Sequence, residues 1–300
     1  MNILLTGASG QLGQELLPQL EQLGEVMSVD RTPFPGLKNM QVQDLGDLGR
    51  LETLLNRTRP DIIVNAAAYT AVDLAEDERE VAFNVNRDLP QRLARWCHLN
   101  HRLMVHYSTD YVFDGQSPRP YLESDVAGPL GVYGESKLAG EQSIIESGCR
   151  HIILRTSWVY SGHGNNFLLT MLKLAGTRPS LSIVNDQVGR PTWARNLAEV
   201  TRLVIEQLGA GQLSGIYHYC DRDVVSWYDF AVEIFHIARE AGLLTKVPET
   251  TPVASAAFPQ KARRPLYSVL DTARIQQQFG ISPASLEESL RACMKDIEKK

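Results

Sequence analysis

Cysteine is scarce in this sequence, and its spacing excludes two common kinds of site. The four cysteines, Cys97, Cys149, Cys220 and Cys293, lie far apart and form no C-x-x-C pair. Structural zinc sites and disulfide frameworks both need closely placed thiols, so we predict neither. A chain of 300 residues can bury a core large enough to fold without cross-links. We therefore expect buried, reduced thiols in a reducing compartment.

Long hydrophobic runs and a basic surplus are also missing. No stretch approaches the roughly 20 apolar residues that span a bilayer, and no basic leader precedes the first apolar run. The formal net charge of -5 argues against the basic face that nucleic-acid binding needs. We expect a cytoplasmic protein that binds neither nucleic acid nor membrane.

Two hydrophobic periods alternate along the first half of the chain. Short aliphatic runs predict buried parallel strands at 2–6, 26–30, 61–66, 102–108 and 151–157. Helical spacing of apolar residues predicts helices over 11–23, 48–57, 81–100 and 131–147. This alternation is typical of an α/β fold with a Rossmann-type, doubly wound parallel sheet.

Three glycines stand between the first strand and the first helix. Gly7, Gly10 and Gly13 form G-x-x-G-x-x-G within "LLTGASGQLGQELL". Glycine lets the backbone turn tightly and approach a pyrophosphate at a helix N-terminus. Asp30 ends the second strand twenty residues after Gly10, where a ribose-binding carboxylate is expected. The pattern predicts a bound dinucleotide.

The choice between NADH and NADPH stays open at this point. Asp30 favours NADH, because a carboxylate bonds the ribose hydroxyls and repels a 2′-phosphate, whereas Arg31 could receive that phosphate. Asp44 and Leu45 could flank the adenine or simply form a turn into the next helix.

The second half of the chain is less regular. Helices are expected near 165–175, 192–208, 226–241 and 283–297, and the proline-rich stretch 242–270 is expected to be a loop. We expect a dinucleotide-binding domain over 1–160, with part of 192–220 packing back on it. Residues 161–300 would form a smaller, mixed α/β substrate-binding region across a cleft.

Hydroxyl residues follow the predicted strand at 102–108, and a tyrosine–lysine pair follows them. Ser108 and Thr109 lie in "HYSTDYVFDG", at the strand end where α/β sheets place their sites. Tyr133 and Lys137 lie four residues apart in "VYGESKLAG" and therefore share a helical face. Taken alone, that spacing equally fits an ordinary surface pair.

The set of motifs resembles the extended short-chain dehydrogenase/reductases, and within them the dTDP-4-dehydrorhamnose reductase family. The resemblance rests on "STDYVFDG", "VYGESKLAGE", "RTSWVY", "GNNF", "NDQVGRPT" and "RRPLYSVLDT", which span nearly the whole chain. It implies NADPH- or NADH-dependent reduction of the C4 ketone of a dTDP-sugar. A dTDP-sugar is the implied partner, and a homodimer is compatible with it.

The resemblance also implies roles for individual residues. Tyr133 would donate the proton, Lys137 would lower the pKa of that phenol and hold the nicotinamide ribose, and Thr109 would bond the substrate oxygen. Cofactor contacts would come from Gly7, Gly10, Gln11, Leu12, Gly13, Asp30, Arg31, Asp44, Leu45, Ala68, Tyr69, Thr70, Tyr107, Tyr133 and Lys137. Substrate contacts would come from Thr109, Asp110, Trp158, Asn166, Gln187 and Arg190.

Some of these contacts have plain alternatives. Trp158 could be a core or interface residue, and Asn166, Gln187 and Arg190 could be ordinary polar loop residues. Arg263 and Arg264 could neutralise the substrate diphosphate or form a solvated basic pair.

Some members of the family dimerise through a metal held by glutamates. Glu15 stands where one such ligand would be, but Arg195 stands where a second acid would be needed. We predict no metal.

Single residues distinguish this chain from some related classes of protein. Nucleotide-sugar 4,6-dehydratases carry a glutamate where this chain has Tyr111, so dehydration is disfavoured. Epimerases share the tyrosine and stay open as an alternative. A regulatory subunit like that of methionine adenosyltransferase, which binds a dinucleotide without catalysis, is disfavoured because Thr109, Tyr133 and Lys137 are all present.

Overall fold

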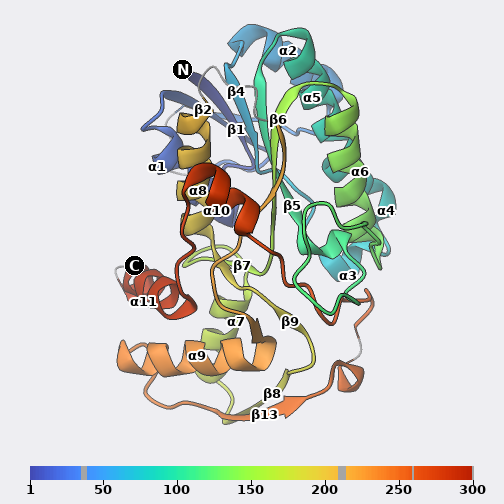
Figure 1. Cartoon of the computed structure of the whole chain (residues 1–300). Helices are drawn as coiled ribbons and strands as arrows, with labels where there is room; N and C mark the ends of the chain where they lie inside the picture. Colours follow the sequence, from blue (N-terminus) through green and yellow to red (C-terminus); the bar gives the residue numbers. More distant parts are fainter. Residues whose placement is uncertain (35–38, 209–213, 259, 299–300) are drawn as a thin grey trace.

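A parallel sheet of seven strands forms the centre of the molecule (Figure 1). The computed structural model describes residues 1–34, 39–208, 214–258 and 260–298. The strand order is β11-β6-β5-β4-β1-β2-β3, which changes direction between β1 and β4. The strands are β1 Asn2–Thr6, β2 Glu25–Asp30, β3 Met40–Val42, β4 Ile62–Asn65, β5 Leu103–Thr109, β6 Arg150–Thr156 and β11 Gly215–His218. The five strands predicted from the sequence are present, and β3 and β11 extend the sheet at its two edges.

Helices cover both faces of this sheet, which confirms the doubly wound Rossmann-type fold (Figure 1). One face carries α1 Gln11–Leu20, α8 Ala194–Gln207 and α10 Ala273–Phe279, and its core joins Leu16 and Leu197 to Ile3 and Val105. The other face carries α2 Leu48–Thr58, α5 Leu89–Leu99 and α6 Val132–Glu146. Burial on both faces explains why the strands are apolar nearly throughout.

The single helix predicted over 81–100 is wrong, because the chain is interrupted there by a π-helical turn. After α3 Val72–Ala75, α4 Arg79–Phe83 gives way to the turn Asn84–Asp88 (η1) before α5 begins. The turn places the buried Asn86 so that its amide bonds both the N–H and the C=O of Tyr69 and also the hydroxyl of Ser136 on α6. The interruption therefore fastens the loop after β4 to α6, and π-turns often mark functional sites.

A second, smaller core lies beside the carboxyl ends of the sheet strands (Figure 1). Its elements are β7 Val159–Tyr160, α7 Phe167–Ala175, β8 Ser180–Val184, β9 Val188–Gly189, β10 Thr192–Trp193, β12 Val225–Ser226, α9 Trp227–Glu240, β13 Glu249–Val253, the 3-10 turn η3 Ser255–Ala257 and α11 Leu286–Glu298. Phe230, Ile234 and Leu290 are buried at its centre. The loop predicted over 242–270 is wrong in part, because β13 pairs in parallel with β8.

Two expectations from composition concern thiols and membrane spans. All four cysteines are buried, and none is in a disulfide. Within the described ranges, no helix is long and apolar enough to cross a membrane.

Candidate active site

One cavity of about 1720 Å³ lies against the carboxyl ends of the sheet strands. Loops following β1, β2, β4, β5 and β6 all contribute to it, and α7, β8 and Trp227 of the smaller core close its far side. The crevice at the point where the strand order reverses is where open α/β sheets bind ligands. Its volume exceeds the usual range of about 300–1000 Å³ for one small molecule and suits two.

The glycine loop fits a dinucleotide on structural grounds. Gly7 adopts φ +71°, and a Cβ on Gly7 would lie 2.5 Å from the backbone nitrogen of Ala67. A Cβ on Gly13 would lie 2.1 Å from the Gly7 carbonyl oxygen. The N-cap Gly10 has no side chain to cap α1, so the first backbone N–H groups of that helix face the cavity. Such a helix terminus is suited to a pyrophosphate.

The residues predicted for the adenosine end also line the cavity. Asp30 accepts hydrogen bonds from the backbone and hydroxyl of Ser9 at 3.0 and 2.7 Å, which fixes its carboxylate beside the glycine loop. Arg31 is exposed at the same edge. Asp44 accepts a hydrogen bond from the backbone N–H of Gly46. It therefore forms the turn and also lines the cavity, with Leu45 next to it.

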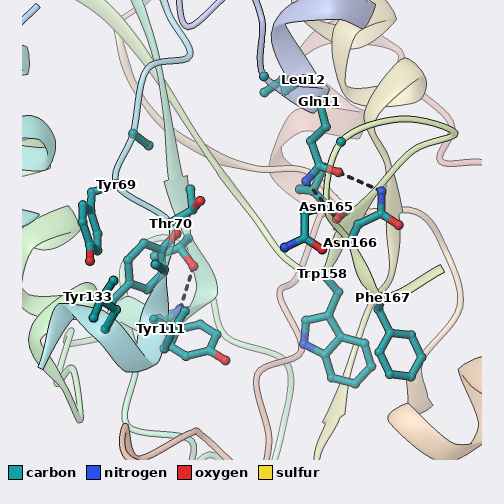
Figure 2. Close-up of a pocket in the computed structure, with 18 of the residues that line it drawn as sticks. Gln11, Leu12, Tyr69, Thr70, Tyr111, Tyr133, Trp158, Asn165, Asn166 and Phe167 are labelled. Atoms are coloured by element: carbon teal, nitrogen blue, oxygen red, sulfur yellow. Dashed lines mark hydrogen bonds between the residues drawn. The ribbon is translucent and has the colours of Figure 1, made fainter. Parts of the chain in front are cut away.

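Tyr133 and Thr109 face each other across the reactive part of the cavity. Burial raises the pKa of Tyr133 to about 12, although its hydrogen bond with Thr109 acts in the opposite direction. The Thr109 hydroxyl also donates to Asp110 at 3.0 Å and accepts the backbone N–H of Tyr111 at 3.2 Å. Tyr111 lies edge-on to the Tyr133 ring, with centroids 5.5 Å apart (Figure 2).

Lys137 lines the same cavity one helical turn further along α6. Its ammonium nitrogen donates to the backbone carbonyl of Tyr107 at 2.6 Å. Burial lowers its pKa to about 8, against the raising effect of Glu141. Burial dominates the pKa of Tyr133, so a lowering influence of Lys137 on that phenol stays a prediction.

Two cavity residues use their side chains in a way that the sequence did not predict. The Tyr107 hydroxyl pairs with Thr201 on α8 at 2.8 Å, so the residue serves Lys137 through its backbone carbonyl instead. Asn166 lines the cavity but caps α7 through its side-chain oxygen, while its amide nitrogen bonds the carbonyls of Ser161 and His163. Its neighbour Asn165 is exposed beside it (Figure 2).

Trp158 forms the wall opposite Tyr133 (Figure 2). Its indole stacks on Trp227 with centroids 3.5 Å apart and lies against Gly189, where a Cβ would approach the ring within 2.6 Å. The residue has φ +49°, a left-handed conformation that is unusual for a bulky side chain. Strained residues of this kind gather at ligand-binding sites.

The remaining predicted residues divide into two groups. Ala68, Tyr69, Thr70, Asp110 and Gln187 line the cavity together with Gln11 and Leu12. Arg190 does not line it, and its guanidinium approaches Thr272 at 3.4 Å. Arg264 lines the cavity while pairing with Asp73 at 2.7 Å, whereas Arg263 lies outside the lining and is exposed.

Several cavity residues were missed from the sequence. Ser108 was noted as a strand-end hydroxyl but given no role, and its hydroxyl has no hydrogen-bond partner among the described residues. Phe167 ends the "GNNF" motif and lies at a tilt against Trp227, with ring centroids 4.6 Å apart. Arg178 and Trp227 carry no local signal, because only the folding of the smaller core brings them to the cavity.

Glu15 is paired with a cation of the chain itself. It is 5% exposed and pairs with Arg195 at 2.9 Å, and His163 lies 3.6 Å away. Arg195 also pairs with Asp296 at 2.7 Å. The described residues contain no cluster of three or more His, Cys, Asp or Glu that could hold a metal ion, and the expectation that this protein binds no metal stays a prediction.

Comparison with known proteins identifies the family. The model described as "RmlD substrate binding domain" matches residues 1–299. The chain is 43% identical to the dTDP-4-dehydrorhamnose reductase of Escherichia coli K12, over 94% of this chain and 93% of that one. The crystal structure of a dTDP-4-dehydrorhamnose reductase from Clostridium acetobutylicum superposes with a TM-score of 0.89 at 36% identity, covering 99% and 100% of the two chains. The corresponding enzyme from Bacillus anthracis, solved with NADP, gives 0.87 at 33% identity, covering 98% and 99%. The chain therefore belongs to the RmlD family, together with these dTDP-4-dehydrorhamnose reductases.

Proposed function

We propose that this protein reduces the C4 ketone of dTDP-4-dehydro-6-deoxy-L-mannose to dTDP-L-rhamnose, with NADPH or NADH as the reductant. The observation that carries the proposal is the cavity itself. It joins a dinucleotide-type glycine loop, a Thr109–Tyr133–Lys137 group and an aromatic wall at Trp158, in a chain of the RmlD family over its full length.

The two ends of the cavity suit the two ligands. The loop after β1 and the carboxylate of Asp30 would hold the dinucleotide, with Arg31 at the edge where a 2′-phosphate would lie. Phe167, Leu174 and Arg178 of the smaller core line another part of the cavity, where a nucleobase and a diphosphate would find an apolar surface and a cation. Asn165 and Gln187 add amides between them.

The residues around Tyr133 would manage the proton. A bound reduced nicotinamide supplies the hydride. Tyr133 would give its phenolic proton to the ketone oxygen as that oxygen gains negative charge, and Thr109 would bond the same oxygen. Lys137 would hold the ribose hydroxyls and help to restore the proton of Tyr133. Trp158 would cover the sugar and exclude water from the site.

Tyr111 argues for reduction over dehydration. Elimination from a 4-keto sugar needs a second acid/base group beside the reactive carbon, and Tyr111 stands where the dehydratases carry a glutamate. Burial raises the pKa of this phenol well above its usual value, so it is a poor base near neutral pH.

The organisation around this site follows from the same proposal. Residues 1–160 would form the dinucleotide-binding domain, with part of 192–220 packed on it, and 161–300 mainly the substrate-binding domain. The burial of Leu197, Val204 and Tyr217 in the core shared with β1 and β5 supports this division. Four buried cysteines outside disulfides fit a cytoplasmic protein. A homodimer is compatible with the proposal.

The test is a direct assay of nicotinamide oxidation. Purified protein is mixed with NADPH or NADH and dTDP-4-dehydro-6-deoxy-L-mannose, and absorbance of the reduced nicotinamide is followed. Loss of absorbance that requires the sugar is expected, and its absence with both cofactors would overturn the proposal.

The proton-donor role has its own variant. Tyr133→Phe keeps the ring packing and removes the donor, so kcat is expected to fall about 10²- to 10⁴-fold with cofactor affinity retained. Tyr121→Phe is the matched control, because Tyr121 is a buried tyrosine outside the cavity whose hydroxyl bonds Asp114 and Ser117. A Tyr133→Phe protein that keeps more than a tenth of wild-type kcat would refute the assignment.

A further inference from the structure

A chain of buried polar side chains runs behind Lys137 into the sheet. The lysine nitrogen lies 3.3 Å from Nε2 of His106 on β5, and Nδ1 of that ring lies 3.0 Å from Nδ2 of Asn65 on β4. The Asn65 oxygen accepts from the hydroxyl of Thr6 on β1 at 2.6 Å. These four residues are at most 2% exposed. Only Lys137 has so far been given a role.

The hydrogen bonds of Thr6 determine which groups donate and which accept along this row of side chains. The Thr6 hydroxyl oxygen accepts the backbone N–H of Ala67 at 3.4 Å, so its own proton goes to the oxygen of Asn65. With the oxygen turned to Thr6, the amide NH₂ of Asn65 points at Nδ1 of His106 and donates to it. A reversed amide would leave the Thr6 proton without an acceptor in a fully buried place.

The tautomer of His106 follows from its partner. Burial, and the charge of Lys137 after it, hold the pKa of His106 well below its usual value, so the ring is neutral. Because Nδ1 accepts from Asn65, the one ring proton is on Nε2 and points at Lys137. An amine nitrogen can accept that proton in a hydrogen bond, whereas an ammonium has no lone pair with which to do so.

We propose that His106, oriented by Asn65 and Thr6, is a positioning residue that presents its Nε2–H to Lys137 and favours the uncharged amine of that lysine. The inference rests on the proposed reductase function for its consequence and on this contact chain for its geometry. Lys137 stays fixed in both of its protonation states, because its nitrogen also donates to the carbonyl of Tyr107.

The other charged groups around Lys137 are paired with other charges, exposed, or on the cavity side. Glu141 lies one turn along α6 and favours the ammonium, but its carboxylate is also held by Arg155 of β6 at 2.6 Å. Asp110 lies on the cavity side. Charged groups on α3, α4, α5 and the π-turn are exposed or paired with other charges, and they include Asp73, Arg79, Arg87, Asp88, Arg92 and Arg95.

The proposal gives Lys137 a defined part in proton exchange. When the O–H bond of Tyr133 breaks and the sugar alcohol O–H forms, the phenolate regains a proton that Lys137 supplies. The lysine then becomes an amine, which the Nε2–H of His106 stabilises, and solvent returns the proton. Lys137 exchanges protons readily because its pKa of about 8 is close to the working pH.

The first test measures the pH dependence of kcat in a His106 variant. His106→Gln puts an amide within reach of Lys137 whose oxygen can turn to the ammonium and accept from it. The ammonium is then favoured, so the alkaline limb of kcat is expected to move upward by about one to two pH units. His151→Gln is the matched control, because His151 is buried in β6 and bonds the carbonyl of Cys149 at 2.9 Å. A limb that stays in place or moves downward overturns the proposal.

The second test does not depend on turnover. In the wild-type protein with ¹⁵N-labelled histidine, His106 is expected to show a protonated Nε2 and a pyridine-like Nδ1. Removal of its signals in His106→Gln assigns them, and the proton-coupled spectrum distinguishes the two nitrogens. A pyridine-like Nε2 or a doubly protonated ring overturns the proposal even if the protein proves active, and the expected tautomer supports it even if no reduction is observed.

Discussion

The carboxyl group of Asp110 offers a sharp test of how burial acts at this site. Asp110 is 1% exposed, and burial raises its pKa to about 6 although hydrogen bonds from Ser268 and Thr109 lower it. The unfolded chain binds this proton with a pKa of 3.8. In the window between these two values the folded protein holds the proton more tightly, so unfolding becomes easier as pH rises from about 4 to about 6.

Substitution by asparagine should remove this pH-dependent cost. A shift of about two pKa units corresponds to about 3 kcal/mol, which is the amount by which ionised Asp110 destabilises the fold above pH 6. Asp110→Asn resembles the protonated acid. The variant is therefore expected to be more stable than wild type by up to about 3 kcal/mol at pH 7.5, and nearly equal to it near pH 4.

Urea unfolding at the two pH values measures the difference. The control is Asp114→Asn, because hydrogen bonds from the Tyr121 hydroxyl and the Gln116 backbone lower the pKa of Asp114. Its substitution should destabilise the protein at neutral pH and have less effect in acid, which is the opposite sign. A stability difference between Asp110→Asn and wild type that does not change with pH, or that favours wild type at pH 7.5, would refute the reasoning.

Two further predictions concern the cofactor and the Glu15 ion pair. Arg31→Ala should raise KM for NADPH about tenfold and leave KM for NADH nearly unchanged, and Asp30→Ala should do the reverse; steady-state kinetics with both cofactors check this. Arg195→Ala should lower the free energy of unfolding by about 1–3 kcal/mol, because solvent screens the 40%-exposed guanidinium but the Glu15 carboxylate that loses its partner is only 6% exposed. Arg195→Glu would gather Glu15, Asp296 and a third carboxylate, so Mg²⁺ should raise the melting temperature of that variant and not that of wild type.

The parts of the fold that the sequence predicts are those set by local patterns. The aliphatic runs gave the five inner strands, and the glycine loop gave the turn into α1, because buried parallel strands and a tight phosphate-type turn restrict residue type directly. The edge strands β3 and β11 lack that signal. They are short, and pairing with β2 and β6 decides their conformation. The π-turn at Asn86 depends on contacts with Tyr69 and Ser136, which no local pattern records.

The site divides in a similar way. Tyr133, Lys137 and Thr109 could be predicted to lie close together, because strand ends and one helical face bring them to the same edge. The contacts that come from distant parts of the chain could not be predicted. Tyr107 bonds Thr201 because α8 packs on the sheet, whereas the cap that Asn166 gives α7 is a local bond to the N–H of Leu169. The His106 tautomer depends on three strands at once.

Lys137 lies one helical turn from Tyr133, and Asp110 bonds Thr109 beside it; burial shifts the pKa values of both groups toward their neutral forms, in opposite directions. The pKa of Lys137 falls to about 8 and that of Asp110 rises to about 6, so both titrate within about one or two units of neutrality. A strongly charged neighbour would hold the Tyr133 proton either in place or away from it. Neighbours that change charge easily instead let the proton leave and return at small cost, as an acid in repeated turnover requires. The burial that makes Asp110 easy to protonate also makes its ionised form destabilise the fold. A substitution that stabilises the protein at this position is therefore expected to reduce activity.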